Sequence, residues 1–291
     1  MVKNTILGGF IMGLPTVALE NGEIIAYRHR PGTGDKTIVL IHGNMTSSLH
    51  WDTVMEALDE KYTIYAVDLR GFGESSYSRE IERIEDFSHD VEEWMAKLDL
   101  RNVTLVGWST GGAVAMDMCI DDTEHRIEKC ILVASASTRG YPFFLQAQQR
   151  IAETKEEIIH DPFVTVPVET MQRMKNYAGI QAVWEQLIYT HYKPDHDHYG
   201  KYLRDICTQQ NLGDVYYALH TFDITDEIDE IQVPMLIIYG DRDYVVSEKM
   251  TQEIITDFGG KAKVLKIKDC GHSPMVDQLN ILTTAIQKFI N

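Results

Sequence analysis

A serine, a histidine and a pair of aspartates stand in this sequence where they could carry out acyl transfer together. Ser109 lies in a Gly-x-Ser-x-Gly motif, and His272 and the acids Asp241 and Asp243 each follow an apolar run late in the chain. A serine hydroxyl is a poor nucleophile until an imidazole accepts its proton, and a carboxylate can hold that imidazole in the required tautomer. These residue types therefore predict nucleophilic catalysis by Ser109, with either aspartate as the orienting acid.

The residues around Ser109 predict a tight turn between a strand and a helix. The β-branched run 103–106 precedes the serine motif, and the apolar segment 113–120 follows it directly. We expect a strained backbone at Ser109, because a side chain at Gly107 or Gly111 would collide with the neighbouring strand or helix as the chain reverses. The alternative interpretation is an ordinary glycine-rich turn with a surface serine.

Strands and helices alternate along most of the chain, which predicts an α/β fold with a mostly parallel central sheet flanked by helices. An Asn-Gly turn at residues 21–22 indicates a hairpin at the start. The later runs are apolar and β-branched, as expected of strands that are buried on both faces. The predicted strands are 37–41, 62–67, 103–106, 130–134, 235–239 and 264–268, and the predicted helices include 48–60, 87–98, 113–120 and a closing helix near 279–289.

This alternation stops at about residue 138, and no later segment up to residue 231 requires a strand. We therefore expect a helical insertion before the last two strands. The predicted division is a core of residues 1–137 and 220–291 with a helical cap of residues 138–219.

The predicted cap is rich in aromatic residues: eight of the 14 tyrosines lie between residues 141 and 217. Such residues suit the wall of a ligand pocket, although each could equally hold a small helical domain together. The residues expected in the pocket are Trp108, Tyr141, Phe144, Trp184 and Val245. We interpret Asp-His-Asp-His at 195–198 as a solvated turn, so no metal site is expected.

Composition narrows the range of partners and compartments. With 27 basic and 44 acidic residues the net charge is −17, which disfavours nucleic acid and anionic membranes as partners. The four cysteines are scattered, which favours reduced thiols in the cytoplasm. The short apolar stretch 6–14 lacks a typical cleavage site, and we interpret it as structural. The expected partner is a small-molecule substrate. Oligomeric state stays open, with a homodimer as one option.

Several motifs make the chain resemble the α/β-hydrolases over about residues 16–136 and 220–291. His-Gly-Asn at 42–44 is similar to the oxyanion loop of that family, and the motif at 107–111 is similar to its nucleophile elbow. Residues 68–75 resemble its D-x-R-G-x-G-x-S turn, while residues 240–243 and 271–272 resemble the loops that carry the acid and the base. The insertion then resembles the cap of lidded members, among them carboxylesterases, meta-cleavage-product hydrolases and haloperoxidase-like enzymes.

The resemblance implies roles for particular residues. Asp243 is favoured over Asp241 because in relatives the acid stands three residues after the glycine that ends the strand. Ser109 would be the nucleophile and His272 the base, and the backbone N–H groups of Asn44 and Thr110 would form the oxyanion hole. No cofactor or metal is implied.

The predicted function is hydrolysis of a carboxylic ester of a small or medium-sized apolar substrate through an acyl-enzyme intermediate. A serine nucleophile disfavours epoxide hydrolases and haloalkane dehalogenases, which place an aspartate at that position. The same triad could cleave a lactone or a carbon–carbon bond next to a ketone. A protein that only binds a ligand is a further alternative, which retention of Ser109, Asp243 and His272 argues against.

Overall fold

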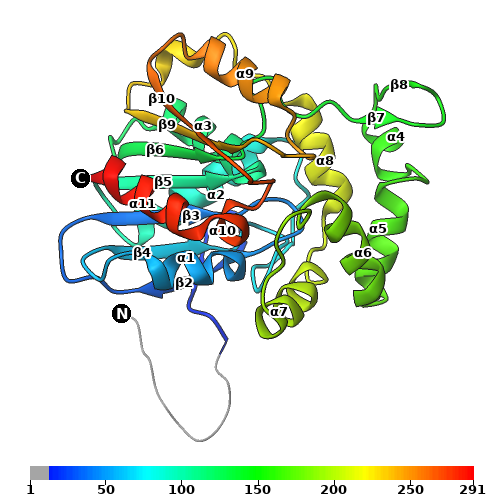
Figure 1. Cartoon of the computed structure of the whole chain (residues 1–291), viewed down its shortest axis with the longest axis horizontal. Coiled ribbons are helices and arrows are strands. Elements are labelled where there is room, and N and C mark those ends of the chain that lie inside the picture. The colour runs from blue at the N-terminus through cyan, green and yellow to red at the C-terminus, as the bar shows by residue number, and fades with distance from the viewer. Residues whose placement is uncertain (1–12) are drawn as a thin grey trace, which may run out of the picture.

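The structure, a computed structural model, describes residues 13–291, so residues 6–12 of the apolar stretch lie outside the described part. Its centre is an eight-stranded sheet of order β1-β2-β4-β3-β5-β6-β9-β10, in which β1 and β2 pair antiparallel and the strands from β4 onward run parallel. The predicted α/β fold is confirmed (Figure 1). The strands are β1 (Thr16–Ala18), β2 (Ile24–Arg30), β3 (Thr37–Ile41), β4 (Thr63–Val67), β5 (Val103–Trp108), β6 (Ile127–Val133), β9 (Met235–Gly240) and β10 (Ala262–Ile267).

The parallel strands end together at one edge of the sheet. Ile41 at the end of β3 pairs with Val67 of β4 and Gly107 of β5, and Ile267 of β10 pairs with Gly240 of β9. The loops that follow β3, β5, β9 and β10 therefore emerge at the same edge. The predicted chemical groups follow these four strands.

Helices cover both faces of the sheet, and each face has its own apolar core. In β3, Val39 and Ile41 pack towards α2 and α3, whereas Ile38 and Leu40 pack towards α1 and α11. Figure 1 shows α1, α10 and α11 in front of the sheet and α2 and α3 behind it. The helices are α1 (Asp52–Ala57), α2 (Ile84–Lys97), α3 (Thr110–Asp121), α9 (Glu248–Asp257), α10 (Pro274–Asp277) and α11 (Leu279–Ile290).

The helix predicted over residues 48–60 is shorter and divided. A 3₁₀ turn, η1 (Ser48–Trp51), precedes α1, and the chain turns extended at Leu58. The Ser47 hydroxyl accepts a hydrogen bond from the Leu49 backbone N–H and so starts the turn tightly. The predicted apolar spacing is confirmed, because Trp51 and Val54 are buried.

Between β6 and β9 the chain leaves the sheet and forms a mainly helical insertion, which Figure 1 shows at the end of the sheet where the parallel strands finish. The prediction that most of this segment is helical is confirmed, and the structure adds a short antiparallel pair of two-residue strands, β7 and β8. Strands of two residues are too short to give an alternating pattern. The elements are β7 (Phe144–Leu145), β8 (Arg150–Ile151), α4 (Lys155–Ile159), α5 (Thr165–Arg173), α6 (Tyr177–Leu187), α7 (His196–Ile206), α8 (Leu212–Thr221) and the 3₁₀ turn η2 (Ile228–Glu230).

The sequence Asp-His-Asp-His at 195–198 starts a helix rather than forming a free turn. The Asp195 carboxylate accepts hydrogen bonds from the backbone N–H groups of Asp197 and His198 and thereby caps α7. Across the described residues, no helix is both long and apolar enough to cross a membrane.

Substitution of Gly107 tests the close packing around the serine turn. A Cβ atom at this position would lie 2.1 Å from the Gly111 carbonyl oxygen, a backbone atom that cannot move alone. We expect Gly107→Ala to lower the free energy of unfolding by about 3 kcal/mol, as overpacked sites do. Chemical denaturation measures this change.

The matched control is Gly200→Ala within α7, where the nearest atom, of Arg204, lies 3.6 Å from the added carbon. Alanine there should stabilise the helix by up to about 1 kcal/mol. Equal effects of the two substitutions would contradict this account of the turn.

Candidate active site

Ser109 sits at the tip of the turn between β5 and α3, in the strained conformation that the sequence predicts. Its backbone has φ 55° and ψ −118°, which non-glycine residues rarely adopt. The Ser109 N–H donates to the Val133 carbonyl at 3.0 Å, and its carbonyl accepts from the N–H groups of Gly112 and Ala136. These bonds from β6 and α3 hold the turn and set the side chain above the sheet edge.

His272 and Asp243 form a buried pair beside this turn. His272 Nδ1 lies 2.8 Å from Asp243 Oδ2, and the two side chains are 3% and 5% exposed. The other oxygen of Asp243 accepts from the backbone N–H groups of Val245 and Val246 at 2.8 and 2.9 Å. A carboxylate fixed at both oxygens can orient an imidazole with little freedom.

Asp241, the alternative acid, binds a backbone group of the loop that precedes His272. Its carboxylate accepts a hydrogen bond from the Cys270 backbone N–H at 3.2 Å and thereby supports the loop that carries His272. Asp243 is thus the acid that contacts His272, in agreement with the position that the family resemblance implies.

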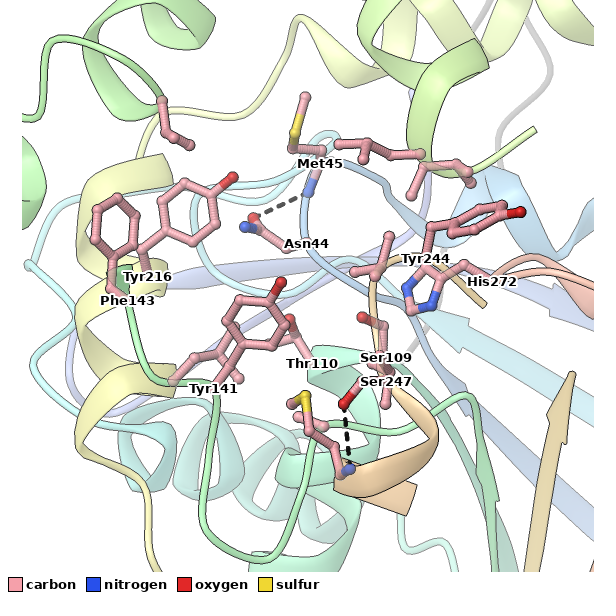
Figure 2. Close-up of a pocket in the computed structure, with 18 of the residues that line it drawn as sticks. Asn44, Met45, Ser109, Thr110, Tyr141, Phe143, Tyr216, Tyr244, Ser247 and His272 are labelled. Carbon is pink, nitrogen blue, oxygen red and sulfur yellow. Dashed lines mark hydrogen bonds between the residues drawn. The ribbon is translucent and has the colours of Figure 1, made fainter. Parts of the chain in front are cut away.

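Ser109 and His272 face the same cavity (Figure 2). The hydrogen bonds of residues 13–291 include none between the Ser109 hydroxyl and the imidazole. Catalytic hydrogen bonds in unliganded enzymes often close only when substrate binds. The structure therefore brings the three predicted residues together and leaves one contact open.

The loop after β3 approaches the serine closely, because a Cβ atom at Gly43 would lie 2.9 Å from Ser109 Cβ. His42 Nδ1 lies 2.7 Å from the Gly43 carbonyl, and Nε2 accepts a hydrogen bond from the Leu69 N–H at 3.0 Å. Complete burial lowers the pKa of His42 to about 4, so the ring is neutral. This neutral ring fixes the loop that presents Asn44.

Asp68 supports the same loop from below. Its two oxygens accept from the backbone N–H groups of Ser48 and Glu74 at 2.8 and 2.9 Å. Burial raises the pKa of Asp68 to about 6. Arg70, in the same motif, pairs with buried Asp90 at 2.6 Å and ties the motif to α2.

The cavity has a volume of about 550 Å³, and both the sheet edge and the insertion line it. Among the described residues its wall contains no Asp, Glu, Lys or Arg side chain. The wall includes all five residues predicted for the pocket, Trp108, Tyr141, Phe144, Trp184 and Val245, together with Ser109, His272, Asn44 and Thr110.

The wall also contains residues that are not among the five predicted for the pocket. Phe143 and Tyr216 belong to the aromatic segment that suggested a pocket, but nothing in the sequence distinguishes them from their neighbours. Met45 and Tyr244 adjoin motif residues and could have been found from that position. The described residues contain no cluster of His, Cys, Asp and Glu that could hold a metal ion.

The chain belongs to the alpha/beta hydrolase family, whose family model matches residues 38–279. A Synechocystis protein named for non-heme chloroperoxidase activity is 28% identical over 255 residues, covering 81% of this chain and 84% of the relative. The pimeloyl-(acyl-carrier protein) methyl ester esterase of Vibrio atlanticus is 25% identical over 241 residues, covering 78% and 84%.

Solved structures agree on the fold. An esterase from Exiguobacterium antarcticum superposes with a TM-score of 0.75 at 20% identity, covering 96% of this chain and 99% of the esterase. An enol-lactonase from Burkholderia xenovorans superposes with a TM-score of 0.74 at 21% identity, covering 95% of this chain and 99% of the lactonase. Together with the family match, these relatives establish a hydrolase-type enzyme.

The buried neutral state of His42 has a measurable consequence. In the unfolded chain this histidine binds a proton below its ordinary pKa of about 6.5, whereas in the fold it does so only near 4. The stability that His42 contributes is therefore complete above pH 6.5 and is lost as the pH falls towards 4. In His42→Gln this loss is absent.

We expect the stability difference between wild type and His42→Gln to shrink by on the order of 3 kcal/mol between pH 7 and pH 4. Urea denaturation at a series of pH values measures it, and comparing the two proteins cancels the opposite titration of Asp68. A difference that stays constant with pH would show that His42 is not held neutral.

Proposed function

We propose that this protein is a serine carboxylic ester hydrolase that acts through an acyl-enzyme intermediate. The observation that carries the proposal is the buried His272–Asp243 pair, 2.8 Å between Nδ1 and Oδ2, facing the strained Ser109 turn across one cavity. The fixed Asp243 keeps a proton on Nδ1, which leaves Nε2 of His272 free to accept the serine proton.

In the proposed reaction, Ser109 Oγ attacks the ester carbonyl carbon while His272 Nε2 takes its proton. The backbone N–H groups of Asn44 and Thr110 stabilise the oxyanion, and losing one such donor typically costs about 3 to 4 kcal/mol. His272 then returns the proton to the leaving alcohol as the carbon–oxygen bond breaks. A water molecule, activated by the same imidazole, hydrolyses the acyl-enzyme and restores Ser109.

The cavity supports an uncharged, largely apolar substrate of small or medium size. Its aromatic and aliphatic wall holds no ionic partner within the described part of the chain, and burying an unpaired charge there would be costly. We further propose that residues 138–219 act as a cap over a core of residues 1–137 and 220–291, since Tyr141, Trp184 and Tyr216 form part of the wall. The free thiols of all four cysteines agree with a cytoplasmic location.

The first prediction for this mechanism concerns the nucleophile. Wild type should hydrolyse uncharged p-nitrophenyl esters, and Ser109→Ala should lower kcat by at least about 10⁴-fold because no other group can form the acyl-enzyme. The free energy of unfolding should stay within about 1 kcal/mol, since the hydroxyl makes no core contact. Activity of the variant within tenfold of wild type would exclude Ser109.

The same assay ranks the alternative reactions when lactones and a vinylogous diketone are added to the ester panel. Faster turnover of a lactone, or of the diketone with carbon–carbon cleavage, would replace ester hydrolysis as the principal reaction while keeping the triad. Binding of these compounds without any turnover would indicate a ligand-binding protein.

The second prediction separates the two acids. Asp243→Asn should lower kcat by on the order of 10⁴-fold, because the amide favours the wrong tautomer of His272. Asp241→Asn is the matched control two residues away. Among residues 13–291 the one hydrogen bond to the Asp241 carboxylate comes from the Cys270 backbone N–H, so the loss of kcat should be much smaller. Steady-state kinetics with one ester measures kcat of both variants. A larger loss in Asp241→Asn than in Asp243→Asn would make Asp241 the acid that orients His272.

A further inference from the structure

We propose that Asn44, Tyr141 and Tyr216 form a polar subsite that recognises an uncharged oxygen atom on the acyl chain of the substrate. The inference rests on the proposed ester hydrolysis by Ser109 and narrows its substrate class. The three side chains line the same cavity as Ser109 (Figure 2). Each has a polar group without a hydrogen-bond partner among residues 13–291.

The orientation of the Asn44 side chain is fixed by its neighbours. Its Oδ1 accepts hydrogen bonds from the Met45 backbone N–H at 2.9 Å and from Gln209 Nε2 at 2.7 Å. A flipped amide would bring its NH₂ group against the Met45 N–H, a second donor. Asn44 Nδ2 is therefore the donor that has no hydrogen-bond partner among residues 13–291, and Figure 2 shows it on the side of Tyr216.

Gln209 can donate to Asn44 only because its own orientation is fixed. Its Oε1 accepts from Gln172 Nε2 at 3.3 Å, and that nitrogen also donates to the Ile206 carbonyl at 3.0 Å. A backbone carbonyl can only accept, so Gln172 must present its NH₂ group here. Gln209 consequently turns its oxygen to Gln172 and its nitrogen to Asn44.

A second branch leads to the same orientation. Gln209 Nε2 also donates to Asn211 Oδ1 at 3.2 Å, and Asn211 Nδ2 donates to the Arg70 carbonyl at 2.9 Å. Gln172, Gln209 and Asn211 are only 3%, 7% and 2% exposed. This buried amide network links α5 and the α7–α8 connection to Asn44, and it aims the Asn44 NH₂ group into the cavity.

The two tyrosines present their hydroxyl groups to the same region. The Tyr141 backbone N–H donates to the Leu219 carbonyl at 2.8 Å, which fixes it against α8. The Tyr216 ring packs on Phe143 with centroids 5.4 Å apart. Figure 2 shows both hydroxyls projecting into the cavity near Asn44. Burial raises the pKa of both phenols, so each stays protonated and can donate or accept.

The chemistry of these groups defines the ligand. Two phenols and an NH₂ group offer donors to an oxygen atom, but the cavity wall has no Lys or Arg side chain in the described residues. A carboxylate would therefore lack a counter-charge, and a wholly apolar chain would leave three polar groups unpaired. An ether, keto or hydroxyl oxygen satisfies the subsite.

The position of the subsite within the cavity identifies which part of the substrate it contacts. In Figure 2, Tyr141 and Tyr216 lie on one side of Ser109, and His272 lies on the other side. Because His272 must protonate the leaving group, that group has to occupy the His272 side. The tyrosines therefore face the acyl chain.

An oxygen scan of the acyl chain tests this inference. p-Nitrophenyl heptanoate is compared with analogues in which one methylene at a time, beyond the one next to the carbonyl, is replaced by an ether oxygen. Every kcat/KM is divided by the rate of hydroxide-catalysed hydrolysis of the same ester. We expect one oxa ester to exceed the all-carbon ester by about tenfold, as one or two neutral hydrogen bonds allow. In Tyr216→Phe that ratio should fall about threefold or more.

Tyr217→Phe is the matched control, since Tyr217 is the next residue of α8 and does not line the cavity. It should keep the wild-type ratio. Gln209→Met tests the amide network. Gln209 is not part of the cavity wall, but its loss releases the Asn44 side chain, so the substitution should lower the ratio of oxa ester to all-carbon ester.

The possible failures are distinguishable. Hydrolysis of all the esters by wild type with equal normalised rates would overturn the subsite and leave the proposed function intact. A ratio that survives in Tyr216→Phe, or falls equally in Tyr217→Phe, would also overturn it. Absence of any ester turnover by folded wild-type protein would overturn the proposed function itself.

Discussion

The site depends on one backbone constraint, the reversal of the chain at Ser109 between β5 and α3. A positive φ at a serine is unfavourable and persists only where the surroundings enforce it. Here a hydrogen bond from the turn to β6 and the close approach of α3 enforce it. That approach requires Gly107 and Gly111, because a Cβ atom at either would lie within 2.3 Å of a backbone oxygen. The turn sets the Ser109 side chain in the wall of the same cavity as His272.

Buried polar groups hold the other loops of the site, and they include both neutral side chains and the Arg70–Asp90 ion pair. Neutral His42 joins the loop after β3 to the one after β4, and the amide network around Gln209 joins Asn44 to the insertion. The insertion also contacts the core directly, where the Ser47 hydroxyl donates to Asp205 at 2.6 Å. A shift of the insertion would thus disturb the loop of Asn44, and in the proposed mechanism this would couple substrate recognition to catalysis.

Local chemistry explains which parts could be predicted from sequence. The strand, turn and helix around Ser109 follow from β-branched residues, glycines and an apolar helix, all adjacent in the chain. The preference for Asp243 over Asp241 came from family resemblance, and only the loop geometry separates the two carboxylates. Nothing in the sequence distinguishes Tyr216 from the neighbouring aromatic residues. Gln209 could not be predicted as a site residue, because its contact with Asn44 joins positions 165 residues apart. No periodicity encodes such tertiary contacts.

Mass spectrometry after reaction with a fluorophosphonate tests whether Ser109 forms the proposed acyl-enzyme. Trypsin cleaves after Arg101 and Arg126, so Ser109 falls in the peptide of residues 102–126. We expect one phosphonyl adduct per chain, on Ser109 of that peptide, and its loss when the ester substrate is present in excess. Folded protein that takes up no adduct, or carries it on another residue, would contradict the account.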